Sequence, residues 1–359
     1  MRIGLMLYGN LDMPSGGFLY DRMTVEYLRS RGDLVEVVSL PWASYVHGLS
    51  WNLSHKLLRR LKDTSVDVLI QDELAHPSLF FLNRRLKRVL ACPFISIVHH
   101  LRSCEARPAW QNRFYRLIEK AYVRSVDGFI VNSEDTRKAV TSLAGNGIPY
   151  VLAYPGGDRF AAGMAPEDVS ARSSTEGPLR IVFVGNIVPR KGLHTLLHAL
   201  SLLPEGAWHL SVAGSEGTNG AYTSSVRRLA EKASIRRYIT FLGRIPDESL
   251  AGALATSHLL VVPSSYEGFG IVYLEAMGFG LPVVASGAGG ARELVRDGIN
   301  GFLIRPGDTA ALAEHVRDLA NDRQRLRNMS LAALRHFSSR PTWADAGEKI
   351  HTFLHSLRQ

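Results

Sequence analysis

The sequence predicts an α/β protein of two domains, each built on a parallel β-sheet that helices cover. Short β-type runs alternate with helical patterns along the chain, which is typical of βαβ units. The chain has 359 residues, 46% of them hydrophobic, which is enough for roughly two domain cores. The alternation stops after Tyr154 and resumes at Leu179, so a hinge between the domains is expected there.

In the first half, runs rich in β-branched residues predict strands, and amphipathic stretches predict helices. The expected strands are 2–7, 34–40, 67–72, 93–98 and 128–133, and two expected helices are 19–31 and 110–124. A stretch rich in Gly, Ala, Ser and Pro then spans 155–178, which is typical of a linker. We therefore expect a first domain over 1–158 and a linker over 159–178.

The second half repeats the pattern. Its expected strands are 179–185, 208–214, 238–243, 258–264, 281–286 and 301–306, which predicts a second domain over 179–341. The last residues, 342–359, carry an apolar stripe at helical spacing, made by Ile350, Phe353, Leu354 and Leu357. This helix either completes a domain core as a terminal helix or crosses back to pack on the first domain.

The composition favours a soluble cytoplasmic protein. The two cysteines, Cys92 and Cys104, form no CxxC pair, and a chain of this size does not need a disulfide. The apolar run after Arg2 is too short for a signal peptide, and no run approaches the ~20 residues that span a bilayer.

The positive charge is unevenly placed. The formal net charge is +9, and residues 51–124 hold 14 Lys or Arg against six Asp or Glu. This region favours an anionic partner, such as a lipid surface or a phosphorylated acceptor. In 51–62, leucines alternate with basic residues, which predicts either an interfacial helix or a core-packed helix with a basic outer face. Nucleic acid is not expected, because no reader motif accompanies the charge.

Ligands of open parallel sheets bind at the carboxyl ends of the strands, so the residues that follow each strand are candidates. After the first strand, Gly16 and Gly17 open a helix, where backbone amides can approach an anion; a plain flexible turn is the alternative. His99 and His100 follow the fourth expected strand and suit hydrogen bonding or proton transfer, unless they are structural. A metal is not expected beside them, because no third ligand lies at suitable spacing.

Three glycine-rich loops in the second half enter helices. In 185–192, Gly185 and Asn186 are followed by Arg190 and Lys191 just before a helix expected at Leu193. Two cations at a helix N-terminus predict an anion site, against the alternative of a solvated basic turn. The loops that begin at 214 and 287 are weak signals alone, but together the loops indicate a long, anionic, hydroxyl-bearing ligand.

The stretch EGFGIVYLEA places two glutamates around a helix start. Glu267 precedes a helix expected from Ile271, and Glu275 lies on that helix within an apolar run. Even if the whole stretch were helical, the two would differ by about 80° in azimuth, so they are not a tight carboxylate pair. We expect them to contact two separate groups of one ligand. The alternative is a solvated Glu267 and a salt-bridged Glu275.

Together these residues resemble the large retaining glycosyltransferase family 4, which has the GT-B fold of two Rossmann-like domains. The family pattern pairs G-R-x-x-x-x-K-G with E-G-F-G-x-x-x-x-E-A, and here the two segments are GNIVPRKG and EGFGIVYLEA. The glycines of the first loop, the histidine after a middle strand and the GG-x-x-E of 289–293 also match. The resemblance covers almost the whole chain and is strongest over 179–308.

The resemblance implies transfer of a hexose from a nucleoside-diphosphate sugar, such as UDP-glucose or GDP-mannose, with retention of configuration and without a metal or cofactor. It places the donor mostly on the second domain. Catalytic roles fall on Glu267 and His99 near the sugar and on Lys191 at the diphosphate. Donor contacts fall on Gly16, Gly17, Gly185, Asn186, Arg190, Lys191, Gly214, Gly268, Phe269, Gly270, Ile271 and, at the ribose, Glu275.

One position departs from the family pattern. Asn186 stands where the first motif has arginine and cannot supply positive charge, so we expect Arg190 to replace it. The implied acceptor is a saccharide or a lipid-linked molecule of cell-surface glycan or glycolipid synthesis, such as polysaccharide biosynthesis. Peripheral contact of 51–124 with a membrane fits such an acceptor. A nucleotide-sugar epimerase and a non-catalytic nucleotide-sugar-binding protein are the alternatives.

Overall fold

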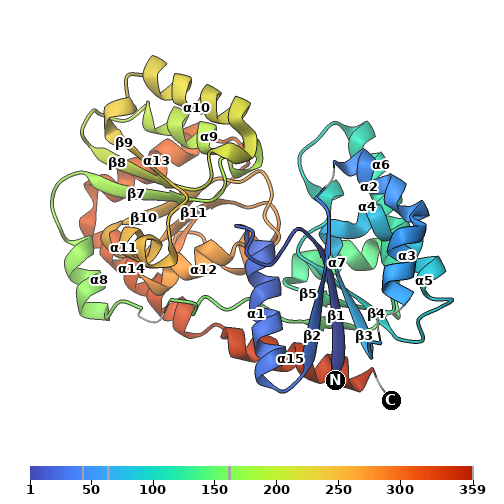
Figure 1. The fold of residues 1–359 in the computed structure, drawn as a ribbon. Coiled ribbons are helices and arrows are strands. Elements are labelled where there is room, and N and C mark those ends of the chain that lie inside the picture. The colour runs from blue at the N-terminus through green and yellow to red at the C-terminus, as the bar shows by residue number, and fades with distance from the viewer. Residues whose placement is uncertain (43, 63–64, 161–162, 358–359) are drawn as a thin grey trace. The chain divides into compact units, whose positions relative to one another are not determined.

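The computed structural model describes residues 1–42, 44–62, 65–160 and 163–357, without the side chains of Arg60 and Lys62. The chain forms two compact units, Met1–Pro155 with Pro341–Gln359, and Gly156–Arg340. Each unit has a six-stranded sheet whose strands all run parallel and are flanked by helices (Figure 1). This confirms the predicted two-domain α/β fold.

In the first unit the strand order is β2-β1-β3-β4-β5-β6. The strands are β1 (Arg2–Tyr8), β2 (Leu34–Leu40), β3 (Val68–Asp72), β4 (Phe94–Val98), β5 (Gly128–Val131) and β6 (Tyr150–Leu152). The helices are α1 (Gly16–Ser30), α2 (Tyr45–Ser50), α3 (His55–Lys62), α4 (His76–Leu79), α5 (Leu82–Leu86), α6 (Ala109–Val123), α7 (Glu134–Ala144) and α15 (Trp343–Ser356).

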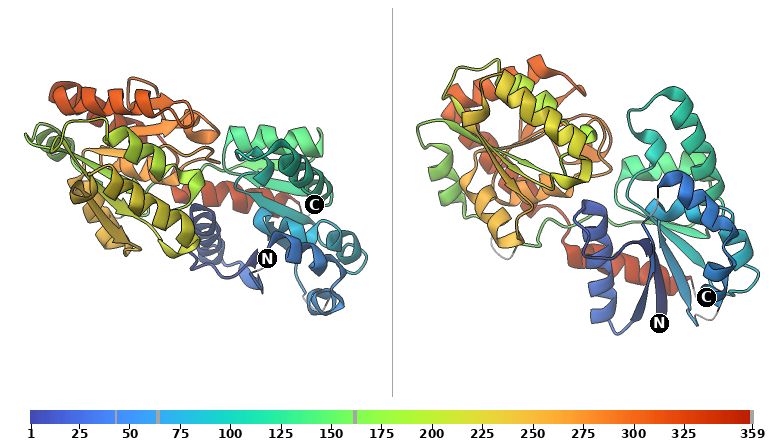
Figure 2. Two further views of the ribbon diagram at one scale, coloured as in Figure 1. Left: turned by 90° about the horizontal axis from the view of Figure 1, so that it is seen from above. Right: turned by 45° about the horizontal axis from the view of Figure 1, so that its top comes forward.

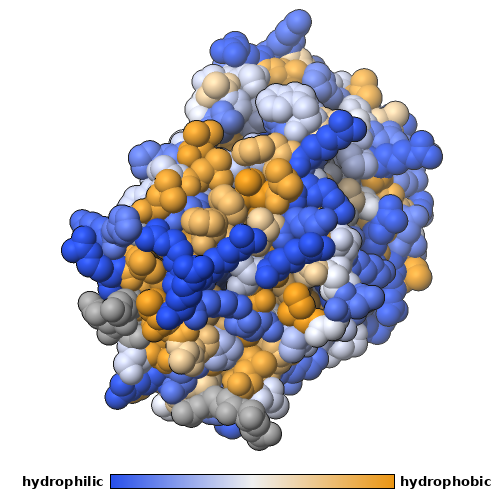
Figure 3. All heavy atoms as spheres, turned by 90° about the vertical axis from the view of Figure 1, so that its right-hand side faces the viewer, coloured by the Kyte–Doolittle hydropathy of each residue, from blue (hydrophilic) through white to orange (hydrophobic). Residues whose placement is uncertain are grey.

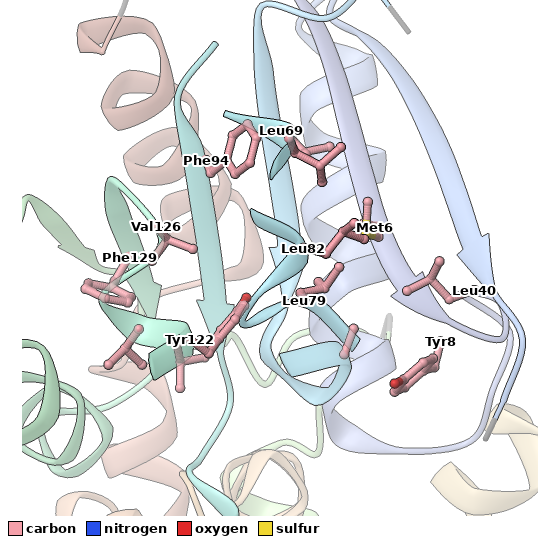
Figure 4. Packing of buried hydrophobic residues seen from close by; sticks show 14 of the residues in the cluster. Met6, Tyr8, Leu40, Leu69, Leu79, Leu82, Phe94, Tyr122, Val126 and Phe129 are labelled. Atoms are coloured by element: carbon pink, nitrogen blue, oxygen red, sulfur yellow. The ribbon is translucent and has the colours of Figure 1, made fainter. Parts of the chain in front are cut away.

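The core of the first unit lies between this sheet and its helices. Figure 4 shows Met6, Leu69 and Phe94 from neighbouring strands packed with Leu79, Leu82 and other apolar residues of the cluster. All five residues of β3 and of β4 are buried, as expected for central strands covered on both faces. The Tyr122 hydroxyl is also buried and donates to Ser96 Oγ at 2.9 Å, which satisfies both polar groups.

In the second unit the strand order is β12-β11-β10-β7-β8-β9. The strands are β7 (Leu179–Val184), β8 (Trp208–Ala213), β9 (Ile239–Gly243), β10 (Leu259–Val262), β11 (Val283–Ser286) and β12 (Gly301–Ile304). The helices are α8 (Pro166–Ser173), α9 (Leu193–Leu200), α10 (Gly220–Lys232), α11 (Asp247–Thr256), α12 (Ile271–Gly278), α13 (Thr309–Asn321) and α14 (Arg323–Ser338). The neighbouring positions of β7 and β10 bring the loops after them together.

Two features differ from the sequence-based expectation. Strand β6, only three residues long, was not predicted. The expected linker over 159–178 contains α8, which belongs to the second unit. Val169 of α8 is fully buried, and the Arg172 guanidinium donates to the backbone oxygens of Phe279 and Gly280 at 2.8 and 2.9 Å. Composition hid this helix, because Gly, Ala, Ser and Pro are frequent over the whole stretch 155–178, although Pro166 and an acidic first turn favour the start of α8.

The C-terminal helix α15 belongs to the first unit, where it packs on α1 and near β6. Its red ribbon runs beside the strands of that unit in both views of Figure 2. Gly347 allows the close approach, since a Cβ there would lie 2.2 Å from the Tyr27 ring. Thr342 and Asp345 form a capping box that starts the helix.

Candidate functional site

The candidate site of the second unit lies at the carboxyl ends of β7 and β10. The loop after β7 leads through a 3₁₀ turn, Pro189–Lys191, into α9, and the loop after β10 leads into α12. The amide of Ser265 donates to the Arg190 carbonyl at 2.7 Å, which ties the two loops together. The predicted starts of α9 at Leu193 and α12 at Ile271 are both confirmed.

Three donors converge on one oxygen of Glu267. Lys191 Nζ lies 2.6 Å from Glu267 Oε1, Arg190 Nη1 lies 3.1 Å from it, and Ser264 Oγ lies 2.8 Å from it. Arg190 Nη1 also donates to the carbonyl of Tyr266 at 2.8 Å. The two cations and one carboxylate leave one excess positive charge at this strand end, which favours an anionic ligand.

Burial and charge act in opposite directions on this cluster. Burial opposes ionisation of Glu267, but Lys191 and Arg190 outweigh it and lower the pKa of the carboxyl to about 2. Burial lowers the pKa of Lys191, and the nearby Glu267 carboxylate counters this effect. Glu267 is therefore an ionised acceptor of hydrogen bonds at neutral pH and a poor proton donor.

Backbone packing fixes the loops that surround the cluster. A Cβ on Gly214 would lie 1.9 Å from the Gly185 carbonyl oxygen, so only glycine lets the loops after β7 and β8 pack this closely. The loop that begins at Glu267 is tied to the loop at Gly289 and Gly290, since the amide of Gly290 donates to the Glu267 carbonyl at 2.9 Å. The backbone carbonyl of Asn186 accepts a hydrogen bond from the amide of Val188 at 2.9 Å, within the loop after β7.

The remaining motif residues form the entry to α12. Gly268, Phe269 and Gly270 are buried, whereas Ile271 is partly exposed at the first position of the helix. Gly270 precedes the helix with φ +94°, in the left-handed region that glycine adopts without strain. The motif therefore places backbone amides at the helix start, beside Glu267.

Glu275 is held by an arginine that the sequence reasoning did not single out. Arg159 Nε and Nη2 lie 2.6 and 3.2 Å from the two carboxylate oxygens, and Arg159 Nη1 contacts Asp247 Oδ1 at 2.9 Å. Burial raises the pKa of Glu275, and Arg159 counters this effect. Glu275 is thus a buried carboxylate oriented by a bidentate ion pair, as the alternative of a salt-bridged Glu275 predicted, and its contact with a ligand stays a prediction.

In the first unit, His99 follows β4 as predicted and lies against two buried acids. Its Nε2 is 3.2 Å from Asp21 Oδ1 and 3.8 Å from Asp72 Oδ1. Burial alone would lower the pKa of His99, but the two carboxylates outweigh it and raise the pKa to about 9. Burial and the neighbouring Asp21 raise the pKa of Asp72. His99 is therefore an imidazolium at neutral pH.

The predicted glycines of the first loop lie beside this histidine. Gly16 and Gly17 are the first two residues of α1, and a Cβ on Gly17 would lie 3.0 Å from His99 Cδ2. Ser15 caps the helix by accepting the amide of Phe18 at 3.3 Å. His100, in contrast, contacts Glu105 at 3.0 Å, which supports a structural role.

The structure decides between the two alternatives for 51–62. Leu57 and Leu61 of α3 are buried in the core, so the core-packed alternative describes that helix. An exposed apolar stripe lies instead on α6, where Trp110, Phe114 and Leu117 are 70, 42 and 65% exposed. Figure 3 shows the face that bears these helices, with apolar areas interleaved among hydrophilic ones.

Sequence reasoning missed Arg159, Asp21, Asp72 and Ser264. The sequence held a signal for two of them. Asp21 lies on the helix that begins at Gly16 and Gly17, and Ser264 ends the expected strand 258–264, just before Glu267. Arg159 had none, because it lies in the stretch interpreted as a linker.

Comparisons with known proteins match both halves of the chain to glycosyltransferase families. Residues 166–336 match the family described as glycosyl transferases group 1, and residues 19–158 match glycosyltransferase family 4. The chain is 31% identical over 240 residues to the D-inositol 3-phosphate glycosyltransferase of Nocardia farcinica, covering 65% of this chain and 53% of that protein. It thus spans about half the length of that relative. It is 29% identical over 314 residues to glycogen synthase of Mycobacterium tuberculosis, covering 82 and 72%.

Solved structures show the same fold. Sucrose-phosphate synthase from Thermosynechococcus elongatus superposes with a TM-score of 0.82 at 20% identity, over 99% of this chain and 98% of that one. Anabaena HepE in complex with UDP-glucose superposes with a TM-score of 0.78 at 21% identity, over 99 and 100%.

Proposed function

Because the chain belongs to the group 1 glycosyl transferases, with a family 4 domain in its first unit, we propose that it moves a hexose from a UDP- or GDP-sugar to a saccharide or lipid-linked acceptor. The observation that carries this proposal is the convergence of Lys191 and Arg190 on Glu267 at the strand ends of the second unit. This cluster combines positive charge, which can bind a diphosphate, with a buried carboxylate, which can accept hydrogen bonds from sugar hydroxyls.

Each donor-binding role has a physical basis in the second unit. A lysine ammonium has three donors, and the contact with Glu267 uses one, so Lys191 can also bind phosphate oxygens. Arg190 lies beside it and supplies the charge that Asn186 lacks. Glu275 keeps lone pairs beyond those that Arg159 occupies, and these can accept ribose hydroxyls.

We assign the reaction as a transfer with retention. The bond between the anomeric carbon and the phosphate oxygen breaks, and the acceptor oxygen bonds to that carbon on the same face. The acceptor proton passes to the departing phosphate. Lys191 and Arg190 stabilise the charge that develops on the diphosphate. Glu267, with a pKa of about 2, stays ionised and holds the sugar.

For the first unit we propose the remaining contacts. The amides of Gly16 and Gly17 at the start of α1 bind phosphate. The His99 imidazolium, kept charged by Asp21 and Asp72, contacts the sugar near the reacting carbon. No metal takes part in the transfer, since the two cations of the second unit supply the electrophilic charge.

A donor screen tests the function. Thermal unfolding is measured with UDP-, GDP- and ADP-sugars, because at equal concentration the ligand that binds most tightly stabilises the fold most. Transfer is then followed with the best donor, and the anomeric configuration of the product is read by NMR. Stabilisation by one nucleotide sugar and a retained product support the proposal. An inverted product, or a rate that depends on added Mg²⁺ or Mn²⁺, contradicts its mechanism.

We also propose that α6 contacts an anionic membrane surface that carries the acceptor. Its apolar stripe is flanked by exposed Arg113 and Arg116, a pattern typical of interfacial helices. No helix among residues 1–42, 44–62, 65–160 and 163–357 is long and apolar enough to cross a membrane. Contact with a membrane surface is supported by the apolar stripe of α6 and the positive charge beside it.

Vesicle flotation tests the membrane contact. The double variant Trp110→Ser/Leu117→Ser should lose binding to phosphatidylglycerol vesicles at physiological salt. Leu202→Ser, which changes a 58% exposed leucine of the second unit, should keep it. Equal flotation with neutral vesicles, or no binding by the unmodified chain, contradicts the proposal.

A further inference from the structure

Two histidines of α15 and one aspartate form a cluster that the transfer reaction does not use. His351 and His355 lie one helical turn apart, with ring centroids 4.2 Å apart. Asp33, in the turn between α1 and β2, faces both of them. One ligand atom of each residue lies within 4.8 Å of the other two. Because Asp33 precedes β2, the cluster lies at the amino ends of the strands, opposite the edge that His99 occupies.

The contacts of the two histidines with Asp33 are long for hydrogen bonds and close to the separation of two ligands of one ion. His351 Nε2 is 3.5 Å from Asp33 Oδ2, and His355 Nε2 is 3.4 Å from Asp33 Oδ1. Good hydrogen bonds of this kind are about 2.9 Å long. Two ligands of one tetrahedral zinc ion, each bonded at about 2.0–2.1 Å, lie about 3.3 Å apart.

A second observation points to a missing partner. Asp33 Oδ1 accepts from the Met1 amino group at 2.8 Å, but Oδ2 is buried and has no hydrogen-bond partner among the described residues. The Asp33 side chain is only 2% exposed. A buried carboxylate oxygen without a partner is costly, and a cation between it and His351 would satisfy it.

The packing of α15 holds the ligands in place and leaves the cluster accessible. Ile350 and Leu354 are buried, so the two histidines that follow them in sequence are fixed beside the apolar face of the helix. One turn earlier, Glu348 accepts from the Tyr27 hydroxyl at 2.7 Å and anchors α15 to α1. The His355 side chain is 39% exposed, which gives an ion a path from solvent.

We propose that Asp33, His351 and His355 bind one divalent transition-metal ion of the zinc type. Two imidazoles and one carboxylate are the donor set that zinc, cobalt and nickel accept, with water in the remaining position. The ion joins the C-terminal helix to the turn before β2 and stabilises the first unit. It takes no part in the transfer reaction.

The test is a zinc titration of the untagged full-length chain after EDTA treatment and dialysis, followed by calorimetry. We expect one zinc ion per chain and a rise in melting temperature on binding. Co²⁺ should give the intense visible absorption of a four-coordinate site. His355→Gln should weaken zinc binding at least tenfold, since even outer-shell changes cost 10–100-fold. Because this side chain is partly exposed, the variant is expected to fold.

The chain supplies a matched control in α9. His194 and His198 have the same spacing, but His194 Nδ1 contacts the Tyr222 hydroxyl at 2.6 Å, and no carboxylate completes a cluster among the described residues. His198→Gln should leave zinc affinity unchanged. Asp33→Asn, checked first for folding without zinc, should weaken binding as His355→Gln does. The absence of a stoichiometric site, or equal effects of the two histidine variants, overturns the proposal.

Discussion

Replacing Glu267 by glutamine should reveal how much the charged cluster contributes to folding. The pKa of Glu267 is about 2 instead of the ordinary 4.5, because Lys191 and Arg190 outweigh the effect of burial. Each pKa unit between the folded and unfolded states corresponds to about 1.4 kcal/mol. The ionised carboxylate therefore contributes about 3 kcal/mol at pH 7, and Glu267→Gln should lower the free energy of unfolding by about that amount.

The same pKa sets a pH dependence of known sign. A carboxyl with a lowered pKa in the folded state stabilises above its unfolded pKa and loses this contribution as the pH falls toward its folded pKa. The difference between the unmodified chain and Glu267→Gln should thus be constant above about pH 5.5. It should shrink to about half, roughly 1.5 kcal/mol, by pH 3.

Urea unfolding of both proteins, followed in steps from pH 7 to pH 3, measures this difference. Glu314→Gln in α13 is the matched control, because Glu314 is an exposed glutamate of the same unit. The control should change stability by less than about 0.5 kcal/mol at every pH. If Glu267→Gln is as stable as the unmodified chain at pH 7, or if its deficit does not change with pH, the reasoning is refuted.

Three further predictions concern charged residues of the two units. Arg190→Ala should weaken binding of the nucleoside diphosphate at least tenfold, nearly as much as loss of the neighbouring lysine, and unchanged affinity in calorimetry would contradict its role. Arg159→Gln should cost about 3–5 kcal/mol because it leaves a buried carboxylate unpaired. Adding Glu275→Gln should restore part of that loss in a double-mutant cycle, whereas simple additivity would exclude the coupling. Asp21→Asn should lower the pKa of His99 from about 9, which an NMR titration measures. The unmodified chain should lose stability as the pH rises from about 6.5 through 9, and Asp21→Asn should lose less over the same range.

The sequence predicted most of the fold because its signals are local. Apolar runs that alternate with helical patterns along the chain indicate β1 to β5 and β7 to β12. Glycine-rich loops follow β7 and β10 and indicate where α9 and α12 begin. Strand β6 is too short to show a period, and α8 is only eight residues long and lies in a stretch rich in Gly, Ala, Ser and Pro, so neither stands out from composition.

The sequence indicated Lys191, Arg190 and Glu267, which the structure brings together, but it predicted none of the contacts among them. The positions of Glu267 and Glu275 around a helix start indicated one ligand, yet the contact between Lys191 and Glu267 joins residues 76 positions apart. Arg159 approaches Glu275 across 116 positions. Such contacts depend on strand order, which brings β7 beside β10, and no local pattern contains that order.

By itself, therefore, the sequence determined the α/β rhythm, the glycosyltransferase motifs and the excess of positive charge, since each depends on neighbouring residues along the chain. Only the tertiary structure decided which charges pair, which leucines of the basic region are buried, and that α6 carries the exposed apolar stripe. It also brought Asp33 to His351 and His355. The physical reason is that burial and pairing depend on packing between segments distant in sequence, and packing sets the pKa values and free energies of those groups.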